Sequence, residues 1–298
     1  MRLISTKFKG AIMQRREFLK QGASLGAIAL MPNFLSSDIL NFKGAKVPEV
    51  ILNNKISMPQ FGFGTWDIRG EEGVNAMLEA YRAGYRLIDS ASYYKNEEQV
   101  GIAFRKSGLK REEVFITTKI ASESDTKQAF ENSLKRLQMD YVDLYLLHWS
   151  TSDDINRYKV LERLYKDGKI RSIGVSNFNI SELNNLMSNT SIIPAVNQIK
   201  INPFERNNKT IEFCKDKNIA IEAYTPLGNI KRAMKNEILT TIAKNHNKTV
   251  AQIMLKWSVQ SGFIAIPKSS NASRIKENID IFDFTLSADE MAKIGSLS

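Results

Sequence analysis

The chain has 298 residues, of which 43% are apolar and 25% are charged, and its formal net charge is +10. This composition allows a large core, and no uninterrupted apolar run reaches the roughly 18 residues that would predict a membrane-spanning helix. The single cysteine, Cys214, excludes an intramolecular disulfide. The length fits either two average domains or one large barrel.

Most of the positive charge lies in the first 46 residues. Eight basic and two acidic residues there give a net charge of +6, which leaves +4 for the rest of the chain. No stripe of basic residues interleaved with aromatic ones follows. We therefore predict a mildly basic, solvated surface and no nucleic-acid partner.

The same region contains the sequence QRREFLKQGASLGAIALMPNFL, in which the pair Arg15–Arg16 precedes a short apolar run. This pattern resembles a twin-arginine export signal, and the apolar run, interrupted by Pro32, is too short to span a bilayer comfortably. We predict a leader and linker over residues 1–46 and export to the periplasm. The alternative is a disordered or helical extension on a cytoplasmic protein. A start at Met13 fits the pattern as well as a start at Met1.

From Val50 the sequence VILNNKISMP places two short apolar runs around Asn53 and Asn54, which predicts a β-hairpin. Strand-like and helix-like segments then alternate along the chain. The predicted strands are 61–65, 86–89, 114–119, 143–148, 172–176, 195–199, 219–224 and 263–267. The predicted helices that follow them are 71–83, 97–106, 126–137, 154–167, 181–188, 209–217, the pair 237–245 and 250–261, and 273–279.

Eight strand-then-helix units in roughly 235 residues predict one (β/α)8 TIM barrel, with the short hairpin before it and a single domain over residues 47–298. The strands are nearly continuous apolar runs, as expected for a parallel sheet that is covered on both faces. The alternative fold is a doubly wound open sheet. The segment GFGTW, however, lacks the third glycine and the helix start of the dinucleotide fingerprint of that fold.

Four ionisable residues stand at the carboxyl ends of three neighbouring predicted strands, where barrels of this type form their active sites. Asp89 ends the second strand with Tyr94 five residues later, Lys119 ends the third, and His148 ends the fourth. Each alone has an ordinary explanation, such as a turn residue, a solvated lysine, rim packing or a core histidine. Together, at equivalent positions of successive units, they favour catalysis.

These residue types predict a definite chemistry. A free tyrosine has a pKa of about 10, and a nearby ammonium group from Lys119 is expected to lower the pKa of Tyr94 toward the working range. Asp89 would hold Lys119 charged and in position, and a neutral His148 would bind a substrate oxygen. Such a site protonates a developing alkoxide, so it requires a hydride donor.

Several separated motifs resemble the aldo-keto reductases in order and spacing: DSASYY at 89–94, ITTK at 116–119, LLHW at 146–149 and GKIRSIGVSNF at 168–178. The resemblance covers residues 48–295. It implies a catalytic tetrad of Asp89, Tyr94, Lys119 and His148, with Tyr94 rather than Tyr93 as the general acid. It also implies NADPH or NADP+ as cofactor, a small carbonyl compound as substrate, no metal, and a monomer.

The resemblance further implies a cofactor site along the later strands. Ser176, Asn177 and Gln198 would bind the nicotinamide carboxamide, and Tyr224 would stack on the nicotinamide ring. The segment IPKSSNASRIKEN would hold the adenosine end, with cations on the 2′-phosphate that favour NADPH over NADH. The implied cofactor contacts are Thr65, Ser176, Asn177, Gln198, Tyr224, Thr225, Leu227, Lys268, Ser269, Arg274, Glu277 and Asn278.

Trp66 and Trp149 would line the substrate pocket, with core packing as the alternative for both. Ser150 stands where many relatives have proline, and the long carboxyl-terminal loop of some relatives does not follow FDFTLSADEMAKI. We therefore expect an open, permissive pocket, and the sequence does not identify the carbonyl substrate. The rival to an enzyme is a cofactor-binding redox sensor on the same scaffold with little turnover. The complete tetrad favours the enzyme.

Overall fold

A computed structural model describes residues 47–121 and 123–298 of the chain. The predicted leader, with Met13 and the pair Arg15–Arg16, lies outside these residues. Within them, every helix is too short or too polar to traverse a lipid bilayer.

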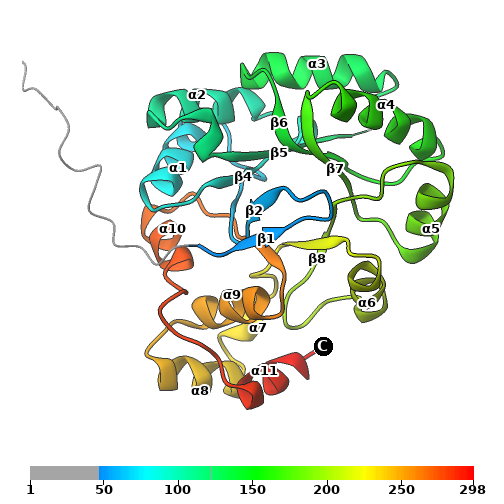
Figure 1. The fold of residues 1–298 in the computed structure, drawn as a ribbon. Helices are drawn as coiled ribbons and strands as arrows, with labels where there is room; N and C mark the ends of the chain where they lie inside the picture. The colour runs from blue at the N-terminus through cyan, green and yellow to red at the C-terminus, as the bar shows by residue number, and fades with distance from the viewer. Residues whose placement is uncertain (1–46, 122) are drawn as a thin grey trace, which may run out of the picture. The chain divides into compact units, whose positions relative to one another are not determined.

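Eight parallel strands form the centre of the molecule, in the order β3 to β10 (Figure 1). The two edges are joined, because Phe61 pairs with Ala265 and the Gly64 N–H donates to the Pro267 carbonyl at 3.0 Å. The predicted closed (β/α)8 barrel is therefore confirmed. The strands are Phe63–Gly64 (β3), Leu87–Asp89 (β4), Phe115–Ile120 (β5), Val142–Leu147 (β6), Ile170–Ser176 (β7), Val196–Lys200 (β8), Ala220–Tyr224 (β9) and Ile264–Ile266 (β10).

Helices cover the outside of the barrel (Figure 1). Many begin at a side chain that accepts a backbone N–H, as Asn179 and Thr249 do in complete capping boxes, so their starts are set locally by sequence. The helices are Gly70–Arg82 (α1), Glu97–Ser107 (α2), Thr126–Leu137 (α3), Asp154–Lys166 (α4), Ile180–Asn189 (α5), Asn208–Asp216 (α6), Ile230–Ala233 (α7), Glu237–His246 (α8), Val250–Gln260 (α9), Ala272–Ile279 (α10) and Ala288–Gly295 (α11), with 3-10 turns at Ser92–Tyr94 (η1) and Arg111–Glu113 (η2). The sequence did not predict α7, α11 or the 3-10 turns.

The predicted hairpin is formed by Glu49–Ile51 (β1) and Ser57–Pro59 (β2), which pair antiparallel. It crosses the centre of the barrel in Figure 1. The Asn53 side chain donates to the Pro194 carbonyl at 2.9 Å, just before β8 begins. The hairpin therefore covers the end of the barrel where the strands start.

Alternate residues of each strand point into the barrel, as the period of two requires. The lower part of the interior is apolar and packs against Leu52 and Met58 of the hairpin. It contains Leu87, Phe115, Leu144, Leu146, Val196, Ile264 and Ile266. Continuing the same inward series by two residues along the strands reaches Asp89, His148 and Gln198. The fold thus brings polar side chains together at the carboxyl ends of the strands, above the apolar lower part of the interior.

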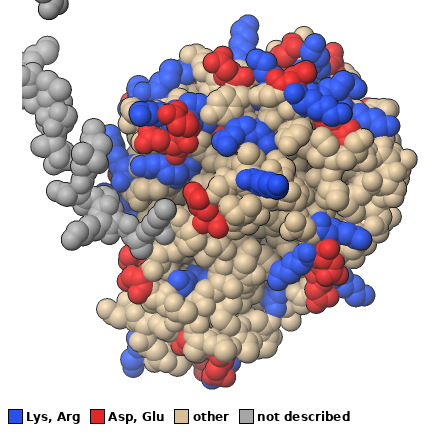
Figure 2. Space-filling model, in the orientation of Figure 1, with Lys and Arg blue, Asp and Glu red and all other residues tan. Residues whose placement is uncertain are grey.

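The surface in view mixes both signs of charge. Figure 2 shows lysines and arginines interspersed with acidic residues on this face, without a stripe of one sign. This distribution agrees with the absence of a basic stripe in the sequence after residue 46.

Candidate active site

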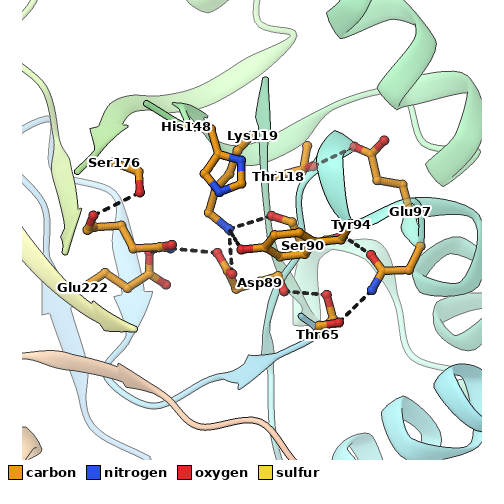
Figure 3. A network of polar contacts seen from close by, with 12 residues as sticks. Thr65, Asp89, Ser90, Tyr94, Glu97, Thr118, Lys119, His148, Ser176 and Glu222 are labelled. Carbon is orange, nitrogen blue, oxygen red and sulfur yellow. Dashed lines mark hydrogen bonds and ion pairs between the residues drawn. The ribbon is translucent and has the colours of Figure 1, made fainter. Parts of the chain in front are cut away.

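The Lys119 ammonium group lies at the centre of the polar cluster. It donates to Asp89 Oδ1 at 2.7 Å, to the Ser90 carbonyl at 2.8 Å and to the Tyr94 hydroxyl at 3.3 Å (Figure 3). An ammonium group has three hydrogens, so every one has an acceptor. Lys119 is fully buried, and Asp89 is nearly so. The structure therefore joins three of the four predicted catalytic residues in one hydrogen-bonded group.

The two adjacent tyrosines have different environments. They share the turn η1, after which Lys95 adopts a left-handed conformation with φ of 55°. Tyr94 is buried against Lys119, whereas Tyr93 is 53% exposed and its ring stacks on Trp66 with ring centroids 5.9 Å apart. Only the Tyr94 hydroxyl reaches the ammonium group, so the geometry favours Tyr94 as the proton donor.

The His148 ring lies edge-on to the Tyr94 ring, at a centroid separation of 5.6 Å. Its ring stacks on Trp149 at 3.6 Å, and its backbone N–H donates to the Ile120 carbonyl at 2.9 Å. Burial and then the Lys119 charge lower the pKa of His148 to about 2, so its imidazole is neutral. A neutral imidazole offers one N–H donor, which suits a hydrogen bond to a substrate oxygen.

The sequence predicted that Lys119 lowers the pKa of Tyr94 below its ordinary value, and this prediction is wrong. Burial is the largest influence and raises the pKa of Tyr94 above its ordinary value, and the Lys119 ammonium group only reduces that rise. Burial alone would lower the pKa of Lys119, but Asp89 and Tyr94 together raise it, so the ammonium group stays charged. Before a substrate oxygen acquires charge, Tyr94 is thus a neutral phenol beside a permanent cation.

Two residues that the sequence reasoning did not select hold this group in place. The Asn96 side chain, fully buried at the start of α2, donates to the carbonyls of Thr65 at 2.7 Å and Ile68 at 2.9 Å and accepts from the Ser90 hydroxyl at 2.8 Å. It ties the loop after β3 to the end of β4. The only signal in the sequence is an asparagine before a predicted helix, which also fits an ordinary cap.

A second missed residue is Glu222, a buried acid in β9. Its carboxyl oxygen Oε2 accepts from Gln198 Nε2 at 2.7 Å, and the same nitrogen donates to Asp89 Oδ2 at 2.8 Å. The acid in the otherwise apolar stretch IAIEAY was the available signal. It was overlooked because it stands within a strand rather than at its end.

Aromatic rings form the rim above the tetrad. Trp66 and Trp149 are 49% and 40% exposed, and Tyr93 lies between them, in contact with both. Trp66 also touches the edge of Tyr94 at 4.9 Å. Both tryptophans therefore face the mouth of the site rather than the core, as the predicted pocket residues should.

The predicted nicotinamide contacts lie side by side on β7, β8 and β9. Ser176 Oγ donates to the Gln198 carbonyl at 3.0 Å, and Asn177 Oδ1 accepts from the Tyr224 hydroxyl at 2.8 Å. Tyr224 is half-buried, so part of its ring remains open. Thr225 follows with φ of 54°, a left-handed conformation that is rare for a β-branched residue and typical of functional loops. These residues fit a planar carboxamide-bearing ring.

The predicted adenosine contacts lie on and before α10. Within the described residues, neither Lys268 nor Arg274 pairs with a carboxylate, and both are exposed. Two unpaired cations beside the helix start fit a phosphate group. Other predicted contacts already have partners or are packed: Thr65 donates to the Asp89 carbonyl at 2.8 Å, Ser269 accepts from the Asn271 N–H, Glu277 accepts from the Thr249 hydroxyl at 2.7 Å, Asn278 is buried, and Leu227 packs against the core.

No group of three or more His, Cys, Asp or Glu side chains that could hold a metal occurs between residues 47 and 298, Ser122 apart. Cys214 is buried, and Asn197 lies 3.7 Å from its sulfur.

Comparison with known proteins is consistent with this geometry. Residues 60–298 match the Aldo/keto reductase family. The chain is 47% identical over 255 residues to the glyoxal reductase of Bacillus subtilis, covering 84% of this chain and 92% of that protein. A crystal structure of an aldo/keto reductase from Brucella melitensis superposes with a TM-score of 0.82 at 43% identity, covering 85% of this chain and all of that one. A Bombyx mori aldo-keto reductase in complex with NADP gives 0.79 at 35% identity, covering 85% and 93%.

Proposed function

The chain belongs to the aldo/keto reductase family, and on this premise we propose that it reduces an aldehyde or ketone to an alcohol with NADPH as the reductant. One observation carries the proposal: the buried Lys119 ammonium group donates at once to Asp89, to the Ser90 carbonyl and to the Tyr94 hydroxyl, below an aromatic mouth. A phenol that can donate a proton and a fixed cation beside it are what a carbonyl oxygen needs as it becomes an alkoxide.

Bound NADPH would supply a hydride to the carbonyl carbon. The residues of this chain act on the carbonyl oxygen, where the hydride leaves an extra electron pair. Tyr94 gives its proton to that oxygen, and Lys119 stabilises the phenolate that remains. The raised pKa of Tyr94 does not prevent the transfer, since an alkoxide is a stronger base than a phenolate. His148 orients the oxygen through its ring N–H.

The preference for NADPH over NADH is supported by the two unpaired cations, Lys268 and Arg274, near the start of α10. A 2′-phosphate carries charge and acceptor oxygens that NADH lacks. The NADP bound to the Bombyx mori relative supports the same choice.

The substrate class follows from the mouth of the site. Trp66, Tyr93 and Trp149 offer flat apolar surface and no charged group, so we propose an uncharged aldehyde or ketone. Glyoxal belongs in the first panel of substrates because a relative with 47% identity is named as a glyoxal reductase.

The test compares Tyr94→Phe with its neighbour Tyr93→Phe. We expect Tyr94→Phe to lower kcat by about 1,000-fold while cofactor binding persists, because only the proton donor is lost. Tyr93→Phe should retain activity within a few-fold. NADPH absorbance with a panel of aldehydes gives the rates, and the reverse result would overturn the assignment. Tight NADPH binding without turnover of any carbonyl compound would instead favour the redox sensor.

We also propose that residues 1–46 direct export to the periplasm, on the strength of the arginine pair and short apolar run. Expression from Met1 and from Met13, followed by cell fractionation, tests this. Export should require Arg15 and Arg16 in either form, and a purely cytoplasmic enzyme from both starts would refute it.

A further inference from the structure

A buried carboxyl group lies below the predicted nicotinamide site and takes no part in the proposed proton transfer. Glu222 is fully buried, and β9 pairs it with Gln198 of β8 and Ile264 of β10. It points into the barrel, since Ala220 and Tyr224, two residues before and after it, pack against the interior core. A buried acid is costly unless its oxygens are used, so its retention calls for a function.

The Glu222 carboxyl group accepts a hydrogen bond from the side-chain amide of Gln198. Both hydrogens of Gln198 Nε2 are taken, one by Asp89 Oδ2 at 2.8 Å and the other by Glu222 Oε2 at 2.7 Å. A flipped amide would set its oxygen against the Asp89 carboxylate, so the orientation is defined. Within the described part of the chain, no hydrogen bond to Gln198 Oε1 is present.

Gln198 lies beside the predicted carboxamide contacts, because its backbone carbonyl accepts from the Ser176 hydroxyl at 3.0 Å and from the Asn177 N–H at 2.9 Å. A carboxamide bound there has one oxygen and two N–H donors, and Gln198 Oε1 is an acceptor for one of those donors. With the Asp89 contact alone, the amide could swivel about a single hydrogen bond. The second contact, from Glu222, fixes its plane.

We propose that Glu222 is a positioning residue: its carboxyl locks the Gln198 side chain so that the amide oxygen is presented to the N–H of the cofactor carboxamide. The inference rests on the proposed function, because it requires a nicotinamide dinucleotide at this site. It also explains why an acid persists here, where an apolar residue would pack without a desolvation cost.

The protonation state of Glu222 agrees with this role. Burial, and next the Asp89 charge, raise its pKa to about 8, so the carboxyl is mostly neutral at pH 7. Oε1 is buried and has no partner among the described residues, and a proton on Oε1 leaves Oε2 as an acceptor. Oε2 then accepts from Gln198 in either protonation state. A glutamine at position 222 would offer the same acceptor, whereas leucine would offer none.

The test measures binding without any carbonyl substrate. The probes are NADPH and its reduced 3-acetylpyridine analogue, which keeps the ring carbonyl but replaces the amide nitrogen by a methyl group. The measured quantity is the Kd of the analogue divided by the Kd of NADPH. We expect Glu222→Leu to reduce this ratio by about tenfold, the contribution of one hydrogen bond to a buried group. Glu222→Gln should keep the ratio within twofold of the parent. A structural defect would weaken both ligands alike and leave the ratio unchanged.

Gln198→Ala provides the matched control. The ratio should fall in this variant, and adding Glu222→Leu should change it no further. An unchanged ratio in Glu222→Leu, or an effect that persists without Gln198, would overturn the inference. Should Glu222→Leu not fold, Glu222→Met makes the same test. The binding test requires no turnover. If the aldehyde assay fails but the Kd ratio still falls in Glu222→Leu as expected, the proposed reaction is refuted and this inference stands.

Discussion

Two buried aspartates of the barrel, Asp89 and Asp143, differ in the cations with which they pair. Asp143, in β6, accepts from Arg111 at 2.6 Å, from Arg171 at 2.7 Å and from the Ile116 N–H at 2.9 Å. Its two cations reach solvent, with side chains 17% and 42% exposed. Asp89 pairs with a cation that is fully enclosed.

The surroundings of the two acids differ in completeness. Each oxygen of Asp143 accepts a hydrogen bond from an arginine that is partly exposed to solvent, which is a stabilising arrangement. Around Asp89, buried atoms without partners occur among the described residues: Glu222 Oε1, His148 Nδ1 and Thr117 Oγ1. The comparison teaches that Asp143 itself is saturated, although Arg111 Nε beside it has no partner among the described residues, whereas around Asp89 several groups of the polar cluster keep hydrogen-bonding capacity unused.

The largest effect should follow from removing the enclosed cation. Lys119→Met is expected to lower kcat by about 1,000-fold, because the phenolate of Tyr94 loses its stabilising charge. Cofactor Kd should change little, since Lys119 lies below the predicted nicotinamide contacts. Steady-state rates and fluorescence titration separate the two effects. A kcat within tenfold of the parent would remove Lys119 from the mechanism.

The opposite pattern is expected at the other aspartate. Asp143→Ala should lower the free energy of unfolding by about 2–4 kcal/mol, because it deletes two charge-assisted hydrogen bonds and leaves the Ile116 N–H unpaired. Its kcat should stay within twofold for the folded protein. Urea unfolding measures the first quantity, and a large loss of kcat at full stability would break the comparison.

A pH-dependent stability term should come from Glu222. Its pKa of about 8 in the folded state lies above the ordinary 4.5, so the folded protein holds a proton that the unfolded chain releases between these values. Stability is therefore lost as pH rises through this window, by on the order of 1 kcal/mol for each pH unit. The groups that face Glu222 are Asp89, Lys119, Tyr94 and Gln198.

Glu222→Gln cannot ionise, so it should stabilise the protein at pH 8 and have little effect at pH 4.5. Thermal unfolding of both proteins at the two pH values provides the measurement. Equal stabilisation at both pH values would indicate better packing rather than a titrating carboxyl.

The smallest effect concerns the exposed cations. Arg274→Ala should weaken NADPH binding by about tenfold, the worth of a charge-assisted hydrogen bond, and leave NADH nearly unchanged. Fluorescence titration of both dinucleotides tests this, with Lys276→Ala on the same helix as the matched control. Equal weakening of both cofactors would remove the phosphate assignment from Arg274.

The fold was readable from the sequence because most strands are largely apolar on both faces and each strand is followed by a helical segment. The clustering of Asp89, Tyr94, Lys119 and His148 was readable too, since parallel strands share one carboxyl edge. Glu222 and Asn96 escaped because their importance depends on which backbone and amide groups they meet across the barrel. The spacing of residues along the chain does not encode those contacts.

The direction of the Tyr94 pKa escaped for a different reason. Sequence indicates that an ammonium group is near the phenol, but the opposing desolvation depends on how completely the surrounding side chains exclude water. That balance is a property of packing, and here burial outweighs the cation.

The hairpin of β1 and β2 also limits how ligands can reach Tyr94. It closes the end of the barrel where the strands start, so the proposed carbonyl substrate and dinucleotide would both reach Tyr94 through the opposite opening. The order in which the proposed cofactor and substrate bind and leave can therefore limit turnover.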